Sequence, residues 1–112
     1  MLTTAGKVTR AASFVTDFPY IEPRNAAGTP ILTARIHVTD ITRCVVTPGN
    51  PLVYVLTISG ADCVSFPTVC HSISFFTGPV GGAEQDSVIA THDETINSVP
   101  SSIISTYTLT IS

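Results

Sequence analysis

The residues with the most chemical potential in this sequence lie in the stretch CVSFPTVCHS, residues 63–72. Cys63, Cys70 and His71 could bind a metal ion, supply a nucleophile or form a crosslink. A structural zinc site needs about four ligands, normally provided as closely spaced pairs. Cys70 and His71 are neighbours in an expected strand, so their side chains point to opposite faces. The spacing argues against zinc and against a Cys–His nucleophile, and no metal site or cofactor is expected.

A structural disulfide is the favoured interpretation of the two cysteines in this stretch. A Cys63–Cys70 bridge would close a short loop and stabilise the fold near the low end of about 2–4 kcal/mol. Cys44 would then be a buried thiol or a bridge to another chain. The sequence leaves two alternatives open: Cys44 pairs with either of the other cysteines, or all three are reduced and buried.

Other polar groups could support catalysis or cation binding, but each has a simpler interpretation. Arg35 and His37 share one face of an expected strand, whereas Asp40 lies on the other face. The remaining candidates are the carboxylates Asp93 and Glu94 beside His92, and Glu84 with Asp86. These carboxylates lack the spacing of a calcium loop, and solvated turns explain them. The sequence also contains no GxSxG or HExxH motif. No catalytic residue is assigned, and the protein is expected not to be an enzyme.

Composition limits the class of protein and its partners. The 112 residues are 44% hydrophobic and 12% charged, with a net charge of −3. They should form a single domain over residues 1–112, because two separate cores would be too small. The five basic residues do not cluster, so nucleic acid is not an expected partner. No apolar run approaches the roughly 18–20 residues that span a bilayer, and the sequence as given begins with no secretory signal.

Alternation of apolar and polar residues predicts an all-β chain, and no window shows a convincing helical period. The expected strands cover residues 7–17, 31–40, 44–46, 52–59, 69–76, 87–91 and 103–111. A bulge or bend is expected at 40–43, where the alternation slips, and turns are expected at 47–51, 60–62 and 77–82. Prolines in the extended segment 18–23 cannot donate to a central ladder. The predicted fold is one antiparallel β-sandwich of six to eight strands, jelly-roll or Ig-like, with 1–6 as an extended N-terminal arm.

The surface chemistry favours self-assembly. The chain has 17 Thr and 11 Ser but a single lysine, Lys7, whereas monomeric sheet proteins commonly protect their edges with charge. We therefore expect an edge strand or the N-terminal arm to pair with another copy of the chain. The alternative is a non-catalytic module that binds a carbohydrate or a protein receptor through the loops near Asn50, 78–82 and 92–94. These loops carry no aromatic residue, which favours assembly.

The stretch ISFFTGPVGG, residues 73–82, and the strand SVIAT that follows at 87–91 resemble the subunits of bacterial endospore appendages. The resemblance implies jelly-roll domains that stack into fibres through N-terminal connectors and inter-subunit disulfides. Residues 1–16 contain no cysteine for such a connector, so no functional residue of that family is carried over. The expected function is that of a structural subunit of an extracellular filament or a virion. Such a subunit would be found outside the cell, on its surface or in a virion, whether its signal has been removed or it is released without secretion.

Overall fold

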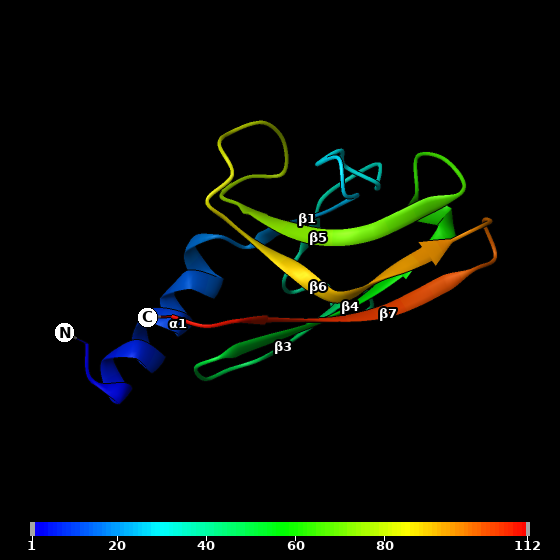
Figure 1. Cartoon of the computed structure of the whole chain (residues 1–112). Helices are drawn as coiled ribbons and strands as arrows, with labels where there is room; N and C mark the ends of the chain where they lie inside the picture. Colours follow the sequence, from blue (N-terminus) through cyan, green and yellow to red (C-terminus); the bar gives the residue numbers. More distant parts are fainter. Residues whose placement is uncertain (1, 112) are drawn as a thin grey trace.

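The computed structural model describes residues 2–111, and its strands form two antiparallel sheets packed as a sandwich (Figure 1). One sheet has the strand order β2-β1-β5-β6 and the other the order β3-β4-β7. The expected β-sandwich is therefore confirmed, and an N-terminal helix precedes it. The elements are α1 (Thr4–Asp17), β1 (Tyr20–Arg24), β2 (Ile36–His37), β3 (Cys44–Thr47), β4 (Leu52–Ser59), β5 (Thr68–Phe76), β6 (Asp86–Ile96) and β7 (Ser102–Leu109).

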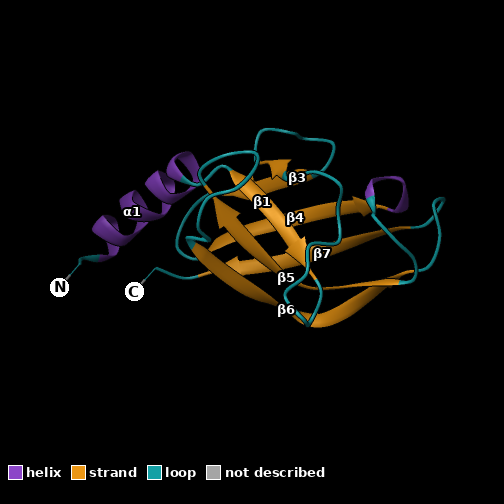
Figure 2. Ribbon diagram, turned by 90° about the horizontal axis from the view of Figure 1, so that it is seen from above, coloured by secondary structure: helices purple, strands orange, loops and turns teal. Residues whose placement is uncertain are grey.

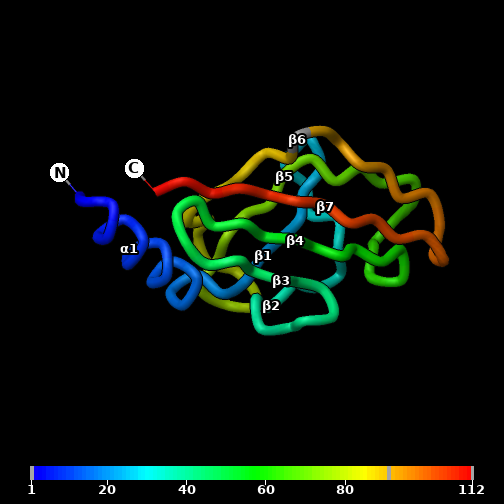
Figure 3. The backbone as a smooth tube through the Cα atoms, turned by 90° about the horizontal axis from the view of Figure 1, so that it is seen from below, coloured from blue at the N-terminus to red at the C-terminus, as the bar shows by residue number. Residues whose placement is uncertain are grey.

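Helix α1 shows that the strand expected at residues 7–17 was wrong, and it also includes part of the expected extended arm. The hydroxyl oxygen of Thr3 caps the helix by accepting a hydrogen bond from the amide of Gly6, at 3.0 Å. Ala11 is fully buried, and the Phe14 ring packs edge-on against Phe75 with centroids 5.0 Å apart. The first turns of the helix project beyond one end of the sandwich, near the last residues of the chain (Figure 3).

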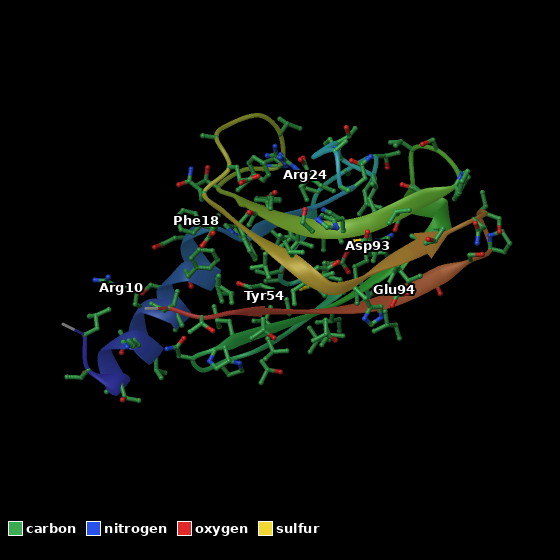
Figure 4. The ribbon with its side chains drawn as sticks, in the orientation of Figure 1. Arg10, Phe18, Arg24, Tyr54, Asp93 and Glu94 are labelled. Atoms are coloured by element: carbon green, nitrogen blue, oxygen red, sulfur yellow. The ribbon has the colours of Figure 1, made fainter. Side chains whose placement is uncertain are left out.

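The buried residues form one core between the two sheets, whose strands Figure 2 shows from above. Strand β4 alternates buried and half-buried residues along its whole length, as the sequence predicted for residues 52–59. Its Tyr54 ring packs on Phe75 of the opposite sheet, with centroids 5.1 Å apart (Figure 4). The Tyr54 hydroxyl is buried without a hydrogen-bond partner in the structure. Burial of these large rings joins the two sheets into one hydrophobic unit.

Strand β1 lies in the middle of its sheet although it contains Pro23. The carbonyl oxygen of Pro23 accepts a hydrogen bond from the amide of Ile31, at 3.1 Å. The backbone of Pro23 therefore faces the 25–31 loop, while the missing N–H costs no bond to β5. In this way the extended segment expected at 18–23 provides a central strand after all.

The long strand expected at 31–40 was largely wrong, since β2 covers only Ile36–His37. The amide of Thr33 donates to the carbonyl of Asp62, and the carbonyl of Ile31 accepts from the amide of Val64. These bonds take the segment away from a regular ladder. The bend expected at 40–43 is confirmed, because the Asp40 carbonyl accepts from the amides of both Arg43 and Cys44.

A bulge interrupts the pairing of β5 with β6. Cys70 is opposite Glu94, but Ser72 is opposite Ile89, so β6 contains extra residues at this point. At the same point of β5, Cys70 and Ile73 are both buried, although strict alternation placed them on opposite faces. The short strand expected at 87–91 is thus part of a longer strand with an irregular centre.

Candidate interaction surface

The three cysteines are free thiols, so the predicted Cys63–Cys70 disulfide is absent from the structure. The two sulfur atoms have different partners. The Cys70 sulfur lies 2.8 Å from the Tyr107 hydroxyl oxygen inside the core. The Cys63 thiol, just after the short 3-10 helix Gly60–Asp62, donates to the Ser59 carbonyl oxygen at 3.5 Å. The loop of Phe66 and Pro67 therefore carries no crosslink.

The buried thiol of Cys44 predicts that stability falls in alkaline solution. Burial, with a smaller contribution from Asp40, raises its pKa from 9.0 to about 11. The unfolded chain ionises first, so this stabilisation is complete below pH 9 and is lost as the pH rises to 11. The Cys44 contribution has a slope of about 1.4 kcal/mol per pH unit in that window.

Chemical denaturation of the wild type and of Cys44→Ala between pH 8 and pH 11 measures this slope. The variant should have a lower free energy of unfolding at pH 8 and a shallower decline above pH 9. Cys63→Ala is the comparison variant: burial also raises the pKa of this less buried thiol, so its removal should reduce the decline by a smaller amount. Equal slopes in the wild type and Cys44→Ala would contradict the assignment.

The side chains of His71 and His92 contact carboxylates rather than the cysteines or each other. His71 points away from the buried Cys70, as predicted, and its Nδ1 lies 2.7 Å from a carboxylate oxygen of Asp93. On β6, Nε2 of His92 lies 2.9 Å from a carboxylate oxygen of Glu94. Figure 4 labels both acidic residues: Asp93 lies on the side of β6 toward β5, and Glu94 lies on the side toward β7. Each histidine has a local carboxylate partner, and neither of them shares a site with a cysteine.

The suspected set of Arg35, His37 and Asp40 is also divided between different partners. Nδ1 of His37 lies 2.7 Å from the Thr39 hydroxyl oxygen. Asp40 instead accepts from the guanidinium of Arg43, at 3.0 Å. The three side chains therefore do not form one catalytic site.

Arg35 is the centre of a polar cluster that sequence reasoning missed. Its Nε donates to a Glu22 carboxylate oxygen at 3.0 Å, and its Nη1 donates to the carbonyl oxygens of Gly78 and Gly81 at 2.9 and 2.8 Å. Its guanidinium carbon lies 3.5 Å from the centroid of the Phe76 ring, a cation–π contact. These contacts attach the 77–82 loop to the outer side of the four-stranded sheet.

Neighbouring charges complete this cluster. Arg24, labelled in Figure 4, donates to Glu22 at 2.9 Å and to Glu84 at 3.1 Å. Glu84 also accepts a hydrogen bond from the Ser74 hydroxyl at 2.6 Å. The charges of the cluster are thus paired with one another. A hollow of about 400 Å³ lies beside it, between the 30–35 segment and the 79–81 loop.

The outer face of the three-stranded sheet has a different chemistry. Its ten side chains are all Val, Ile, Thr or Ser, without a single charge: Val45, Thr47, Val53, Val55, Thr57, Ser59, Ser102, Ile104, Thr106 and Thr108. Val55 is at the centre, with Val45 of β3 on one side and Thr106 of β7 on the other. Val45 is 56% exposed and Ile104 is 68% exposed. We call these ten residues the uncharged face.

Comparison with protein-family models, with curated proteins and with solved structures finds no match to this chain. Within residues 2–111, no helix has the length and apolar character needed to cross a membrane. Over the same residues, no three His, Cys, Asp or Glu side chains gather closely enough to hold a metal ion.

Proposed function

We propose that this protein is a structural subunit that assembles with copies of itself through the uncharged face. The observation that carries the proposal is an exposed sheet surface of ten β-branched or hydroxyl side chains without a charge. Charged residues are depleted from the centres of protein interfaces, and exposed apolar patches on sheets commonly mark interaction sites. The outer face of the other sheet carries Glu22, Arg24 and His71, which suits contact with water.

Two uncharged faces can pack against each other as the layers of a sandwich do. Aligned sheets pack about 10 Å apart with interdigitating side chains, and β-branched residues give the surface of each sheet a regular shape. Contact between identical faces is an isologous interface with a two-fold axis. Burial of Val45, Val55 and Ile104 at this interface would supply the apolar contribution to binding.

An extracellular filament or a virion is the proposed setting, and the protein is proposed to lie outside the cell, on its surface or in a virion. Repeated copies in such a structure bury the same surface many times, and the hydroxyl-rich, charge-poor sheet suits that use. The charges near the candidate polar sites are already paired within the chain. The proposed partners are therefore further copies of the chain.

One feature favours the alternative, a non-catalytic module that binds a carbohydrate or a protein receptor. The hollow of about 400 Å³ has apolar walls from Pro30, Pro79 and Val80 and a polar base from Glu22 and Arg35. A small part of a ligand could occupy it. Its charged groups already bond to each other and to the loop carbonyls, which leaves few groups to fix the orientation of a ligand.

Sedimentation velocity over a range of protein concentrations tests the assembly proposal. The face contact alone closes as a dimer, so the wild type should form dimers, and larger species if a second contact joins them. Val55→Lys should weaken the face contact, because it places an unpaired charge at the centre of the face. We expect its association to be weakened by at least tenfold. Ile89→Lys adds the same charge at an exposed position on β6 of the other sheet and is the matched control. A wild type that stays monomeric, or a Val55→Lys variant that assembles fully, would refute the proposal.

A further inference from the structure

We infer that the free edge of β7 pairs with the same edge of a second copy, so that two three-stranded sheets become one antiparallel sheet of six strands. This inference rests on the proposed function, because the partner is another copy of the chain. It adds a second contact, made by backbone groups rather than by the uncharged face. The evidence is the direction of the backbone groups of β7 and the absence of edge protection along this strand.

The register shows which residues of β7 have backbone groups without a partner strand. The amide of Thr57 donates to the carbonyl of Arg43 at 3.0 Å, so the odd-numbered residues of β4 direct their backbone groups toward β3. The even-numbered residues of β4 therefore face β7. Their partners on β7 are Ile103, Ser105, Tyr107 and Leu109. The residues between them, Ile104, Thr106 and Thr108, direct their N–H and C=O groups away from the sheet.

Strand β6 lies beside part of this edge but forms no ladder with it in the described residues, because β6 and β7 end different sheets. A hollow of about 140 Å³ separates His92 and Glu94 of β6 from Ile104–Thr106 of β7. The first half of β6 diverges from β7, as Figure 1 shows. The segment from Thr106 to Thr110 is therefore the open part of the edge.

The β7 edge lacks the features that normally prevent pairing. Its sequence, SIISTYTL, contains no charge, no proline and no glycine. The outer strands at the opposite side are protected: β2 has two residues, and β3 has four. In β3 the outward amide of Cys44 already donates to the Asp40 carbonyl at 2.8 Å, and Pro48 follows the strand. The remaining edge strand, β6, is interrupted by the bulge and carries Asp86, Asp93 and Glu94. Among the described edge strands, free pairing capacity is thus concentrated on β7.

The open segment is complementary to itself. With a two-fold axis at Thr108, this residue lies opposite Thr108 of the partner subunit, and Thr106 lies opposite Thr110 of the partner subunit. The outward N–H and C=O groups then meet as antiparallel hydrogen-bonded pairs. The hydrogen-bonded pairs 108/108 and 106/110 are both Thr–Thr, which is favourable across strands, and no like charges meet at the axis. The joined edge also extends the uncharged face from one subunit to the next.

Amide hydrogen exchange, followed by NMR, tests this contact in Val55→Lys, whose uncharged face is blocked. Edge pairing predicts a concentration-dependent dimer in which the amides of Thr106, Thr108 and Thr110 exchange at least tenfold more slowly than in the dilute monomer. The amide of Tyr107 faces β4 and is the internal control. Adding Thr108→Pro, which removes one outward N–H, should return the double variant to a monomer.

The outcomes separate the two proposals. If Val55→Lys is monomeric at every concentration and its outward amides stay unprotected, the edge contact is refuted, while assembly of the wild type through its face still stands. If the wild type itself never assembles, the proposed function fails and the edge contact fails with it.

Folding of Thr108→Pro is checked by protection of the odd-numbered amides of β7. If the proline disrupts the strand, Thr108→Cys in a Cys63→Ser background replaces it, and failure to form a disulfide dimer on oxidation refutes the proposed register.

Discussion

Replacement of Gly60 by alanine is expected to destabilise the protein by about 3 kcal/mol, through overpacking against rigid backbone. Gly60 follows β4 and donates its amide proton to the Ser101 carbonyl at 2.8 Å. A Cβ atom on this residue would overlap the Ser98 carbonyl oxygen and lie 2.8 Å from that of Val99. Both obstacles are main-chain atoms of the turn between β6 and β7, so a side-chain rotation cannot relieve the overlap.

Urea denaturation at pH 7 measures this loss, with Gly78→Ala as the matched control. At Gly78 the nearest atom to an added Cβ is 4.0 Å away, and the backbone is outside the left-handed region. The control should change the free energy of unfolding by no more than about 0.5 kcal/mol. Similar values for the two variants would show that the 98–101 turn does not pack on Gly60 in solution.

Removal of the Arg35 side chain is the second large effect, with an expected loss of about 3 kcal/mol for Arg35→Ala. The Glu22 side chain is only 12% exposed and would lose one of its two guanidinium partners. The carbonyl oxygens of Gly78 and Gly81 would lose their donor, and the Phe76 ring its covering cation. Detachment of the 77–82 loop should follow.

Two measurements identify the cause of this loss. Limited proteolysis should cut Arg35→Ala within residues 77–85 much faster than the wild type, because a loop without its anchor is more accessible. Arg35→Lys should be intermediate, since an ammonium keeps the charge but cannot bond to Glu22 and both carbonyls in the same fork geometry. Arg10→Ala on the exposed part of α1, labelled in Figure 4, controls for loss of an arginine. Unchanged cleavage in Arg35→Ala would argue against an anchoring role.

The sequence predicted the strands whose alternation is bounded by strong turns. The strand at 52–59 was found with its expected bounds, because Gly49, with a φ of 126°, lies in the turn between β3 and β4, and Gly60 follows the strand. The helix was missed although Val8, Ala11, Val15 and Phe18 recur at helical spacing behind the Thr3 cap. Alanine is only weakly hydrophobic, so the sequence offers little indication that Ala11 is buried.

Other features depended on contacts that no local pattern shows. Strict alternation cannot reveal the extra residues of β6 opposite His71, because an insertion in one strand is seen only against its partner. Glu22 and Arg35 meet only after β1 and the following loop have folded. The Cys63–Cys70 bridge was inferred from spacing alone, whereas the Tyr107 hydroxyl in the folded chain is the partner of Cys70. The uncharged face could be anticipated in composition, but its outline required the register of β3, β4 and β7.

Free thiols in the core make formation of the fold independent of any oxidant. Cys44 packs as a small apolar group and Cys70 contacts the Tyr107 hydroxyl, both as free thiols, so no electron transfer accompanies the folding equilibrium. A reducing compartment therefore removes no crosslink from the sandwich. A buffer of reduced glutathione should leave the denaturation midpoint of the subunit unchanged.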